Sequence, residues 1–170
     1  MDTLPGQHDS CAYVVGDDGL ARWSDTHRDA WIGLLETHKR LTRALEAELE
    51  AEHGLSLSSL ELLGRLAAAD ERTLRLTALA DQTGLSLSRV SRIMDVLEAR
   101  GLVERRLCDS DARARNAWLT EAGLELLRAA QATHFAGVQR RFFDHTEPEE
   151  VAAMAAAFSR FAPDGASSCT

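Results

Sequence analysis

The stretch from residue 76 to residue 120 contains the pattern that most restricts how this chain can fold. A short segment with helical spacing of apolar residues ends at Gly84, and a second such segment ends at Gly101. Beyond Gly101 the apolar spacing changes from helical to extended, which predicts two short strands, 102–107 and 113–119, around a turn. Two short helices joined by a glycine turn and followed at once by a hairpin are typical of a winged helix-turn-helix.

Longer amphipathic helices are predicted on both sides of this stretch. Apolar residues recur at three- and four-residue steps over 31–49, 124–142 and 151–161. A middle domain of roughly 65 residues has too little surface to cover all three stripes. A second copy of the chain is the simplest partner for them, so we expect a homodimer.

Side chains that accept hydrogen bonds from backbone N–H groups predict where the helices begin. The predicted caps are Ser58 with Glu61 in a capping box, Thr77, Ser86, Thr120, and Thr146 with Glu149 in a second box that has Pro148 in its first turn. A short alternating run at 73–76 predicts one further strand.

The predicted fold class is therefore mainly α with a small β-hairpin wing, an α+β arrangement of a winged helix-turn-helix domain and a helical dimerisation domain. The predicted boundaries, in chain order, are 1–24 for a polar N-terminal arm, 25–57 for an N-terminal dimerisation helix, 58–120 for the winged helix-turn-helix domain, 121–162 for C-terminal dimerisation helices and 163–170 for a tail.

Composition and charge narrow the class of protein. The chain is 45% hydrophobic and 27% charged, which is typical of a globular protein, and its three cysteines fit a reducing cytoplasm. The longest uncharged apolar run, 151–158, is too short to span a bilayer, and the N-terminus has no basic flank of a signal peptide. We therefore expect a cytoplasmic protein with no membrane association.

The net charge of −8 is unevenly distributed. Residues 89–115 hold seven arginines against five acidic residues, a charge of +2, so the rest of the chain carries −10 of the total. Such a locally basic segment can dock on phosphate, although an ordinary solvated face has the same composition.

The second helix of the helix-turn-helix carries the candidate contacts to base edges. Burial of Val90, Ile93 and Leu97 would leave the other faces free for DNA. Arginine can bind guanine with two hydrogen bonds, and serine can reach a base or a phosphate. The candidate contacts on this helix are Ser86, Ser88, Arg89, Ser91 and Arg92, with Asp95 beside them.

Arginines also flank the predicted turn of the hairpin. Arg105 and Arg106 precede the turn, and Arg113 and Arg115 follow it. A two-stranded ribbon of this kind suits the minor groove or its phosphates. Asp111 shares a strand face with Arg113, where it would either hold the guanidinium extended or simply neutralise it.

Together these motifs resemble the MarR family, the winged-helix regulators named for multiple-antibiotic resistance. The matching text is LADQTGLSLSRVSRIMDVLEARGLVERR, then Asp111-x-Arg113, then LTEAG at 119–123, with AEHGLSLSSLELLGRL at 51–66 in support. The resemblance implies a homodimer whose terminal helices interlock, a recognition helix from Ser86 to Asp95, and a wing pair in which Arg113 enters the minor groove. It also implies double-stranded palindromic DNA as partner and, in many members, repression that small aromatic or phenolic ligands relieve.

The resemblance also implies an effector pocket between the first two helices and the DNA-binding domain. His38 lies on the apolar stripe of the first helix, where it would be either a polar anchor for a ligand or a core histidine bonded to a carbonyl. The candidate walls of the pocket are Trp31, Leu34, Leu60 and Trp118.

Other chemistry has less support in the sequence. A redox- or metal-responsive sensor would use Cys108, which lies at the wing turn, and some of the six histidines, but no Cys/His pair has metal-ligand spacing. The branch of the family that senses peroxide has a cysteine near the start of its first long helix, whereas 30–35 holds none here. No phosphate-binding glycine loop, GxSxG or HExxH occurs. We expect a ligand-responsive repressor without enzymatic activity, cofactor or metal, with a protein–protein adaptor that retains the fold as the other alternative.

Overall fold

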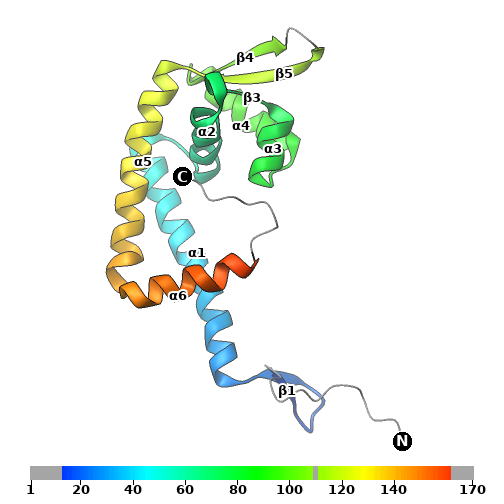
Figure 1. Cartoon of the computed structure of the whole chain (residues 1–170), viewed down its shortest axis with the longest axis vertical. Coiled ribbons are helices and arrows are strands. Elements are labelled where there is room, and N and C mark those ends of the chain that lie inside the picture. The colour runs from blue at the N-terminus through cyan, green and yellow to red at the C-terminus, as the bar shows by residue number, and fades with distance from the viewer. Residues whose placement is uncertain (1–12, 109–110, 162–170) are drawn as a thin grey trace, which may run out of the picture. The chain divides into compact units, whose positions relative to one another are not determined.

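A computed structural model describes residues 13–108 and 111–161 of the chain (Figure 1). It separates the chain into two units, 1–43 and 44–170, which we describe in turn. No helix in the described ranges is long and apolar enough to cross a membrane.

The first unit begins with a small antiparallel hairpin that the sequence did not predict. Strands β1 (Tyr13–Val15) and β2 (Ala21–Trp23) pair in the register Tyr13↔Trp23. Gly16 N donates to Leu20 O at 3.0 Å, and the rings of Tyr13 and Trp23 meet edge-on with centroids 5.8 Å apart. Each strand has only three residues, too few to give a recognisable alternation, so the segment was predicted only as a polar arm.

The first helix, α1, runs from Asp25 to His53 and confirms the prediction of a long helix over the apolar stripe 31–49. Gly54 has a φ of 60°, a left-handed conformation that glycine adopts without strain. The last turns of α1 belong to the second unit, where Leu45 and Leu49 are buried.

The second unit contains the remaining elements in the expected order. They are α2 (Leu57–Ala68), the 3₁₀ turn η1 (Asp70–Arg72), β3 (Thr73–Arg75), α3 (Leu76–Thr83), α4 (Leu87–Ala99), β4 (Val103–Cys108), β5 (Asp111–Leu119), α5 (Glu121–Arg141), η2 (Phe143–His145), α6 (Pro148–Phe158) and η3 (Ser159–Phe161). The fold is mostly helical with small antiparallel sheets, so the predicted fold class is confirmed.

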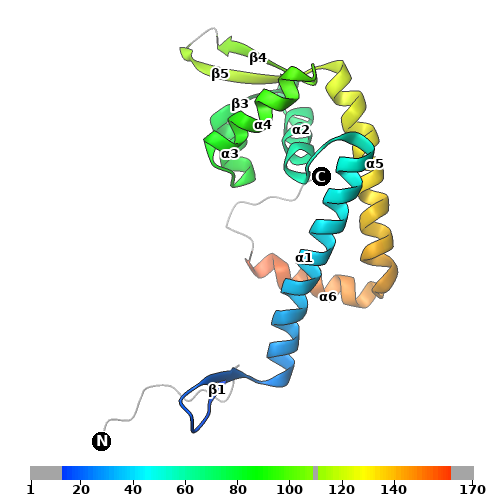
Figure 2. The same ribbon diagram turned by 180° about the vertical axis from the view of Figure 1, so that it is seen from behind.

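The sheet of the second unit is antiparallel with the strand order β3-β5-β4. Thr73 pairs with Trp118, and Val103 pairs with Leu119. Strands β4 and β5 lead away from the end of α4 to the wing and back, as Figure 2 shows. They continue to Cys108 and Asp111, so they take up most of the segment that was predicted as a turn.

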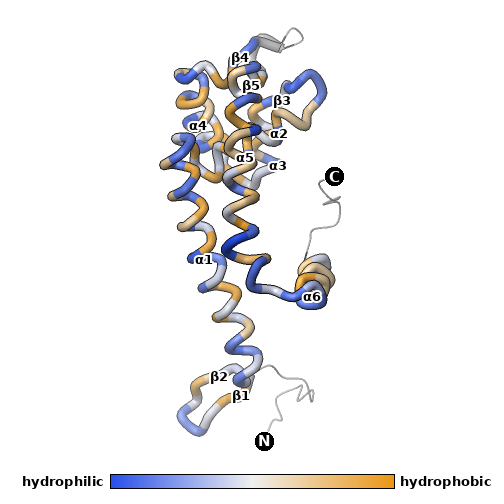
Figure 3. The backbone as a smooth tube through the Cα atoms, turned by 90° about the vertical axis from the view of Figure 1, so that its left-hand side faces the viewer, coloured by the Kyte–Doolittle hydropathy of each residue, from blue (hydrophilic) through white to orange (hydrophobic). Residues whose placement is uncertain are grey.

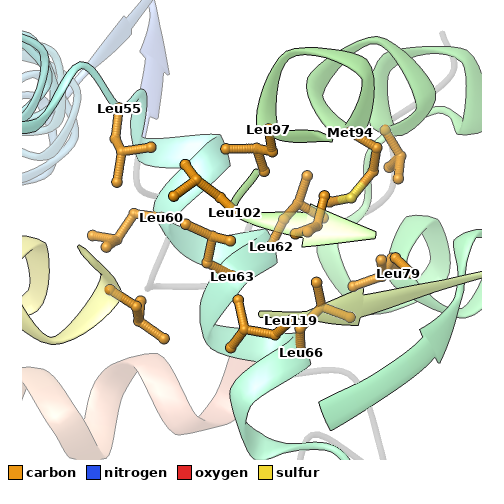
Figure 4. Close-up of a cluster of buried hydrophobic side chains, with 14 of the residues drawn as sticks. Leu55, Leu60, Leu62, Leu63, Leu66, Leu79, Met94, Leu97, Leu102 and Leu119 are labelled. Atoms are coloured by element: carbon orange, nitrogen blue, oxygen red, sulfur yellow. The ribbon is translucent and has the colours of Figure 1, made fainter. Parts of the chain in front are cut away.

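Leucines from α2 form the centre of the core (Figure 4). Side chains of α3, α4 and the sheet close around them, among them Leu79, Met94 and Leu119. The sequence placed Ile93 in the core of α4, but Ile93 is only half-buried and Met94 is fully buried. The reason is that α4 packs through positions 90, 94 and 97, an i, i+4, i+7 stripe.

Two of the predicted helix caps are confirmed. Ser86 Oγ accepts from Arg89 N at 3.3 Å at the start of α4. Thr120 Oγ1 accepts from Gly123 N at 3.0 Å at the start of α5. Each bond satisfies one of the N–H groups that the first turn of a helix leaves without a partner.

The other three predicted caps were wrong by one or two residues. The cap of α2 is Ser56 rather than Ser58, because Glu46 on α1 accepts from Leu57 N at 2.9 Å and so satisfies an earlier turn. Helix α3 begins directly after β3, which puts Thr77 inside its first turn. At α6, Pro148 occupies the first helical position, so the capping box is formed by Glu147 with Glu150.

Candidate nucleic-acid interface

Helix α4 is fixed by its buried face and presents polar side chains on the other faces. Ser88, Arg89 and Arg92 are exposed, and Ser91 is half-buried. Ser86 is exposed as well, although its hydroxyl caps the helix. The structure therefore gathers the five predicted contacts of this helix on one element.

Arg89 and Arg92 make only weak contacts within the chain. Arg89 Nη2 donates to Ser58 Oγ, and Arg92 Nε donates to the carbonyl of Ser88, both at 3.3 Å. The two side chains line a hollow of about 620 Å³ with Ile93 and residues at the end of α1 and the start of α2. A phosphate or a base edge can replace contacts of this length without leaving a buried group unpaired.

Arg100 and Arg105 are bonded to other parts of the chain, so fewer arginines of 89–115 are available to DNA than the residue count indicates. Arg100 donates to the carbonyls of Gly54 and His53, at 2.5 and 2.9 Å. The guanidinium of Arg105 lies against α4, with Nη1 2.6 Å from Asp95 Oδ1. Sequence reasoning placed Arg105 with the arginines near the wing turn, whereas its side chain packs back onto the recognition helix.

Arg106 points to the other side of the same strand and is exposed. Its guanidinium carbon lies 3.9 Å from the centroid of the Trp118 ring, and its Nη2 lies 3.1 Å from Glu104 Oε2. A cation stacked on an indole can still present N–H groups to an acceptor, but Arg106 Nε and Nη2 both donate to Glu104 Oε2, so an acceptor on DNA would compete with this carboxylate. Trp118, one of the predicted effector walls, is therefore covered by an arginine.

The tip of the wing lies outside the described side chains. The backbone places Asp111, Arg113 and Arg115 on β5, with Arg115 opposite Leu107 on β4. The side chains of these three residues and of Cys108 belong to the part that the structure does not describe. Their roles at DNA stay predictions.

The predicted effector residues fall in two different units. Trp31, Leu34 and His38 are exposed in the first unit, where Trp31 and Leu34 line a hollow of about 520 Å³ together with Trp23 and His27. Sequence reasoning missed Trp23 because it placed no element before residue 25, and His27 because the predicted apolar stripe began at Trp31. His38 does not lie in a core in this single chain.

In the second unit, Leu60 lines a hollow of about 570 Å³ between α2 and α5. His134, Gln131 and Phe135 line it from α5, and Gly64 lies on the α2 side. Within the described chain, His134 Nδ1 is buried without a hydrogen-bond partner. Burial lowers the pKa of His134, because it disfavours the charged imidazole. No sequence pattern distinguishes this histidine, since only the packing of α5 shows that one of its nitrogens has no partner among the described residues.

Among the described residues, no group of three His, Cys, Asp or Glu side chains is arranged to hold a metal ion. The chemistry that this part of the chain offers is cationic and hydroxyl-bearing, carried by α4 and the start of the wing.

Comparisons with known proteins point in the same direction. A model of the MarR family matches residues 53–114. The crystal structure of AbsC, a MarR family transcriptional regulator from Streptomyces coelicolor, is 36% identical, with a TM-score of 0.75, over 82% of this chain and 95% of that one. Sco3205, a MarR family transcriptional regulator from the same organism solved in complex with DNA, is 30% identical, with a TM-score of 0.77, over 82% of this chain and 88% of that one.

A curated relative is similar over a shorter stretch. The transcriptional repressor MprA of Escherichia coli K12 is 32% identical over 95 residues, which are 56% of this chain and 49% of that protein. The alignment thus spans about half of the relative's length.

Proposed function

The chain belongs to the MarR family of transcriptional regulators, and we propose that it represses transcription by binding double-stranded DNA as a homodimer. In this proposal α4 enters the major groove, and the β4–β5 wing lies beside the adjacent minor groove. The observation that carries it is a capped, well-anchored helix whose exposed faces bear Ser88, Arg89 and Arg92, none of them held by a strong contact. The similarity to Sco3205, which was solved with DNA, supports it.

We propose a role for each candidate contact. Arg89 and Arg92 are proposed to read base edges, with Ser86, Ser88 and Ser91 at bases or phosphates. Arg106 is exposed above Trp118 and is proposed to contact the backbone. Arg113 is proposed to enter the minor groove, with Asp111 and Arg115 beside it.

Exposed apolar side chains on the terminal helices support the dimer. Phe135 on α5 is 65% exposed, and Phe161 in η3, which follows α6, is 82% exposed. Figure 3 shows α6 as a mostly apolar helix, and none of its residues is buried in this chain. Trp31 and Ile32 on α1 are likewise exposed. A second copy that covers these surfaces explains why they are apolar, and the two-fold axis then makes the operator palindromic.

A small aromatic or phenolic effector is proposed to release the repressor. The hollow between α2 and α5 has the composition of a small-ligand site, with apolar walls and a few polar groups such as the free His134 Nδ1. A phenolic hydroxyl is a fitting donor to that nitrogen.

The central test measures binding to a duplex from the protein's own promoter region. Replacing Arg89 or Arg92 by Ala should cost about 1–3 kcal/mol and should relax preference at one position of each half-site. Arg65→Ala is the matched control, because Arg65 lies on α2 and pairs with Glu61. Wild-type protein that folds and shifts no duplex would reject the proposal and would favour an adaptor that keeps the fold.

Two further measurements test the dimer and the effector. Light scattering at micromolar concentration should give about twice 18.6 kDa. A phenolic ligand should weaken DNA binding of the wild type and of Gly64→Ala, but not of Gly64→Phe. A Cβ at position 64 meets no described atom within 4 Å, and Gly64 lines the hollow, so a phenyl group at this position is expected to fill it. A stable monomer would contradict the proposed dimer. A Gly64→Phe variant whose DNA binding the ligand still weakens would contradict the proposed effector site.

A further inference from the structure

Arg105 on β4 contacts α4 at three positions along one face of the helix. Its Nη1 lies 2.6 Å from Asp95 Oδ1, and its Nη2 donates to the carbonyl of Ser91 at 2.8 Å. Its backbone N donates to Glu98 Oε1 at 3.0 Å. Positions 91, 95 and 98 follow an i, i+4, i+7 spacing, so this one strand residue is bonded along about two turns of the helix.

These contacts remove Arg105 from the surface that DNA would meet. Its side chain is only 13% exposed, whereas that of Asp95 is 58% exposed. Leaving this position would break the charge-assisted pair with Asp95 and remove the second hydrogen bond that the Ser91 carbonyl accepts. The pairing also neutralises Asp95, a carboxylate on the helix that is proposed to face phosphates.

The neighbouring arginine provides a natural contrast. Arg106 is 52% exposed and lies over Trp118 on the opposite side of β4. Successive residues of a strand point to opposite faces, so the strand itself separates the two arginines. One of them faces the helix, and the other faces solvent.

We infer that Arg105 is a positioning residue that fixes the wing strand to the recognition helix and compensates Asp95, so that helix and wing meet DNA as one rigid body. This inference rests on the proposed DNA-binding function. It distinguishes Arg105 from the arginines that this function would use as direct contacts, namely Arg89, Arg92, Arg106, Arg113 and Arg115.

The test measures affinity for one operator duplex at several salt concentrations. The variants are Arg105→Met, Arg106→Met, Asp95→Asn and the double variant Arg105→Met with Asp95→Asn. We expect Arg105→Met to weaken binding about tenfold or more, as for one member of a coupled network, with an unchanged slope of log affinity against log salt. Arg106→Met should lower the magnitude of that slope by about one, because a phosphate contact is lost. The double variant should bind no more weakly than Arg105→Met, since both changes remove the same pair.

Several outcomes would overturn the inference. If Arg105→Met lowers the magnitude of the salt slope by about one, Arg105 contacts a phosphate directly. If the effects of Arg105→Met and Asp95→Asn on affinity are additive, the two residues do not act as a pair. Unchanged affinity of Arg105→Met for the operator would show that Arg105 has no role in DNA binding. Arg105→Lys is the conservative variant, because lysine can pair with Asp95 but lacks the fork that also reaches Ser91. It should recover part of the lost affinity, and no recovery would count against the inference.

A readout without DNA keeps the inference separate from the proposed function. Hydrogen exchange should be faster across 103–106 in Arg105→Met and in Asp95→Asn than in the wild type, with α2 unchanged. Equal exchange in this strand would contradict the fixation of the wing. If the wild type shifts no duplex, the DNA-binding function fails, and this exchange experiment alone decides whether Arg105 holds the wing.

Discussion

Gly123, in the first turn of α5, lies directly against the carbonyl group of Leu102, and a Cβ at position 123 would be 2.1 Å from the carbonyl oxygen. The same oxygen accepts hydrogen bonds from the backbone N of Thr120 at 3.2 Å and from its Oγ1 at 3.0 Å. The start of α5 is therefore fastened to the residue that leads into β4. This contact joins the DNA-binding part of the fold to a helix that is proposed to form the dimer.

Gly123→Ala should destabilise the protein by about 1–3 kcal/mol or more, because the obstacle is backbone and cannot move aside as a side chain can. Gly64→Ala is the control. An added Cβ there meets no described atom within 4 Å, and alanine in a helix is favoured over glycine by up to about 1 kcal/mol. Chemical denaturation of both variants checks the prediction, and equal stabilities would contradict it.

Glu48 should contribute stability that depends on pH. The hydrogen bond from Arg141, supported by Arg140, lowers the pKa of Glu48 below its usual value. A lowered pKa means that the unfolded chain takes up the proton first, so the contribution is complete above about pH 4.3 and is lost as the pH falls towards the folded value. The difference in melting temperature between wild type and Glu48→Gln should be constant from pH 6 to 8 and should shrink below about pH 4.3. A difference that does not depend on pH would show that the two arginines do not stabilise the carboxylate.

His134 should add a second pH dependence at a higher pH. Burial lowers the pKa of this imidazole, so it folds in its neutral form. The unfolded chain is protonated first as the pH falls through about 6.5, so stability is full above that pH and declines below it. Unfolding free energies of wild type and His134→Gln should therefore converge or cross between about pH 7 and 5, with the steeper decline in the wild type. If the unfolding free energies of the two proteins change with pH in parallel, the His134 ring is solvated in the folded protein.

Arg113 remains the sharpest test of the wing. If it enters the minor groove, Arg113→Ala should weaken binding to specific and non-specific DNA alike and should lower the salt slope by about one. Asp111→Ala should act in the same direction if Asp111 orients the guanidinium, and should tighten binding if it only adds negative charge. Melting temperature and dimer mass should stay nearly unchanged, since an exposed ion pair contributes at most about 1 kcal/mol. An unaltered affinity and slope in Arg113→Ala would remove the wing from the interface.

The order of elements could be predicted from the sequence because apolar spacing and glycine positions encode it locally. Gly54, Gly84 and Gly101 all have the left-handed φ expected after a helix. Helix starts were harder, because a distant group can satisfy an N–H. Glu46 does so for α2 from eleven residues away, which no local motif reveals.

The helix of the candidate site could be predicted from the sequence, whereas the positions of the arginines on the following strand could not. Helical spacing correctly predicted that Arg89 and Arg92 are exposed, since one face of α4 had to be buried. The separation of Arg105 from Arg106 depends on which face of β4 packs against α4, and this is decided by tertiary structure. His134 and the hollow beside it likewise arise only when α2 and α5 pack together.

The contact of Arg100 with the end of α1 affects which segments of related proteins can be combined in one chain. Its guanidinium holds the carbonyls of His53 and Gly54, which are backbone groups that every sequence supplies. A chimera that takes residues 58–120 of this chain, and with them Arg100, and the long helices of a relative would therefore keep this tether whatever side chains the relative has at positions 53 and 54. It would lose the tether only where the turn after α1 has another shape. On the α1 side of this seam, compatibility between parts of different origin thus depends on the path of the chain rather than on residue identity.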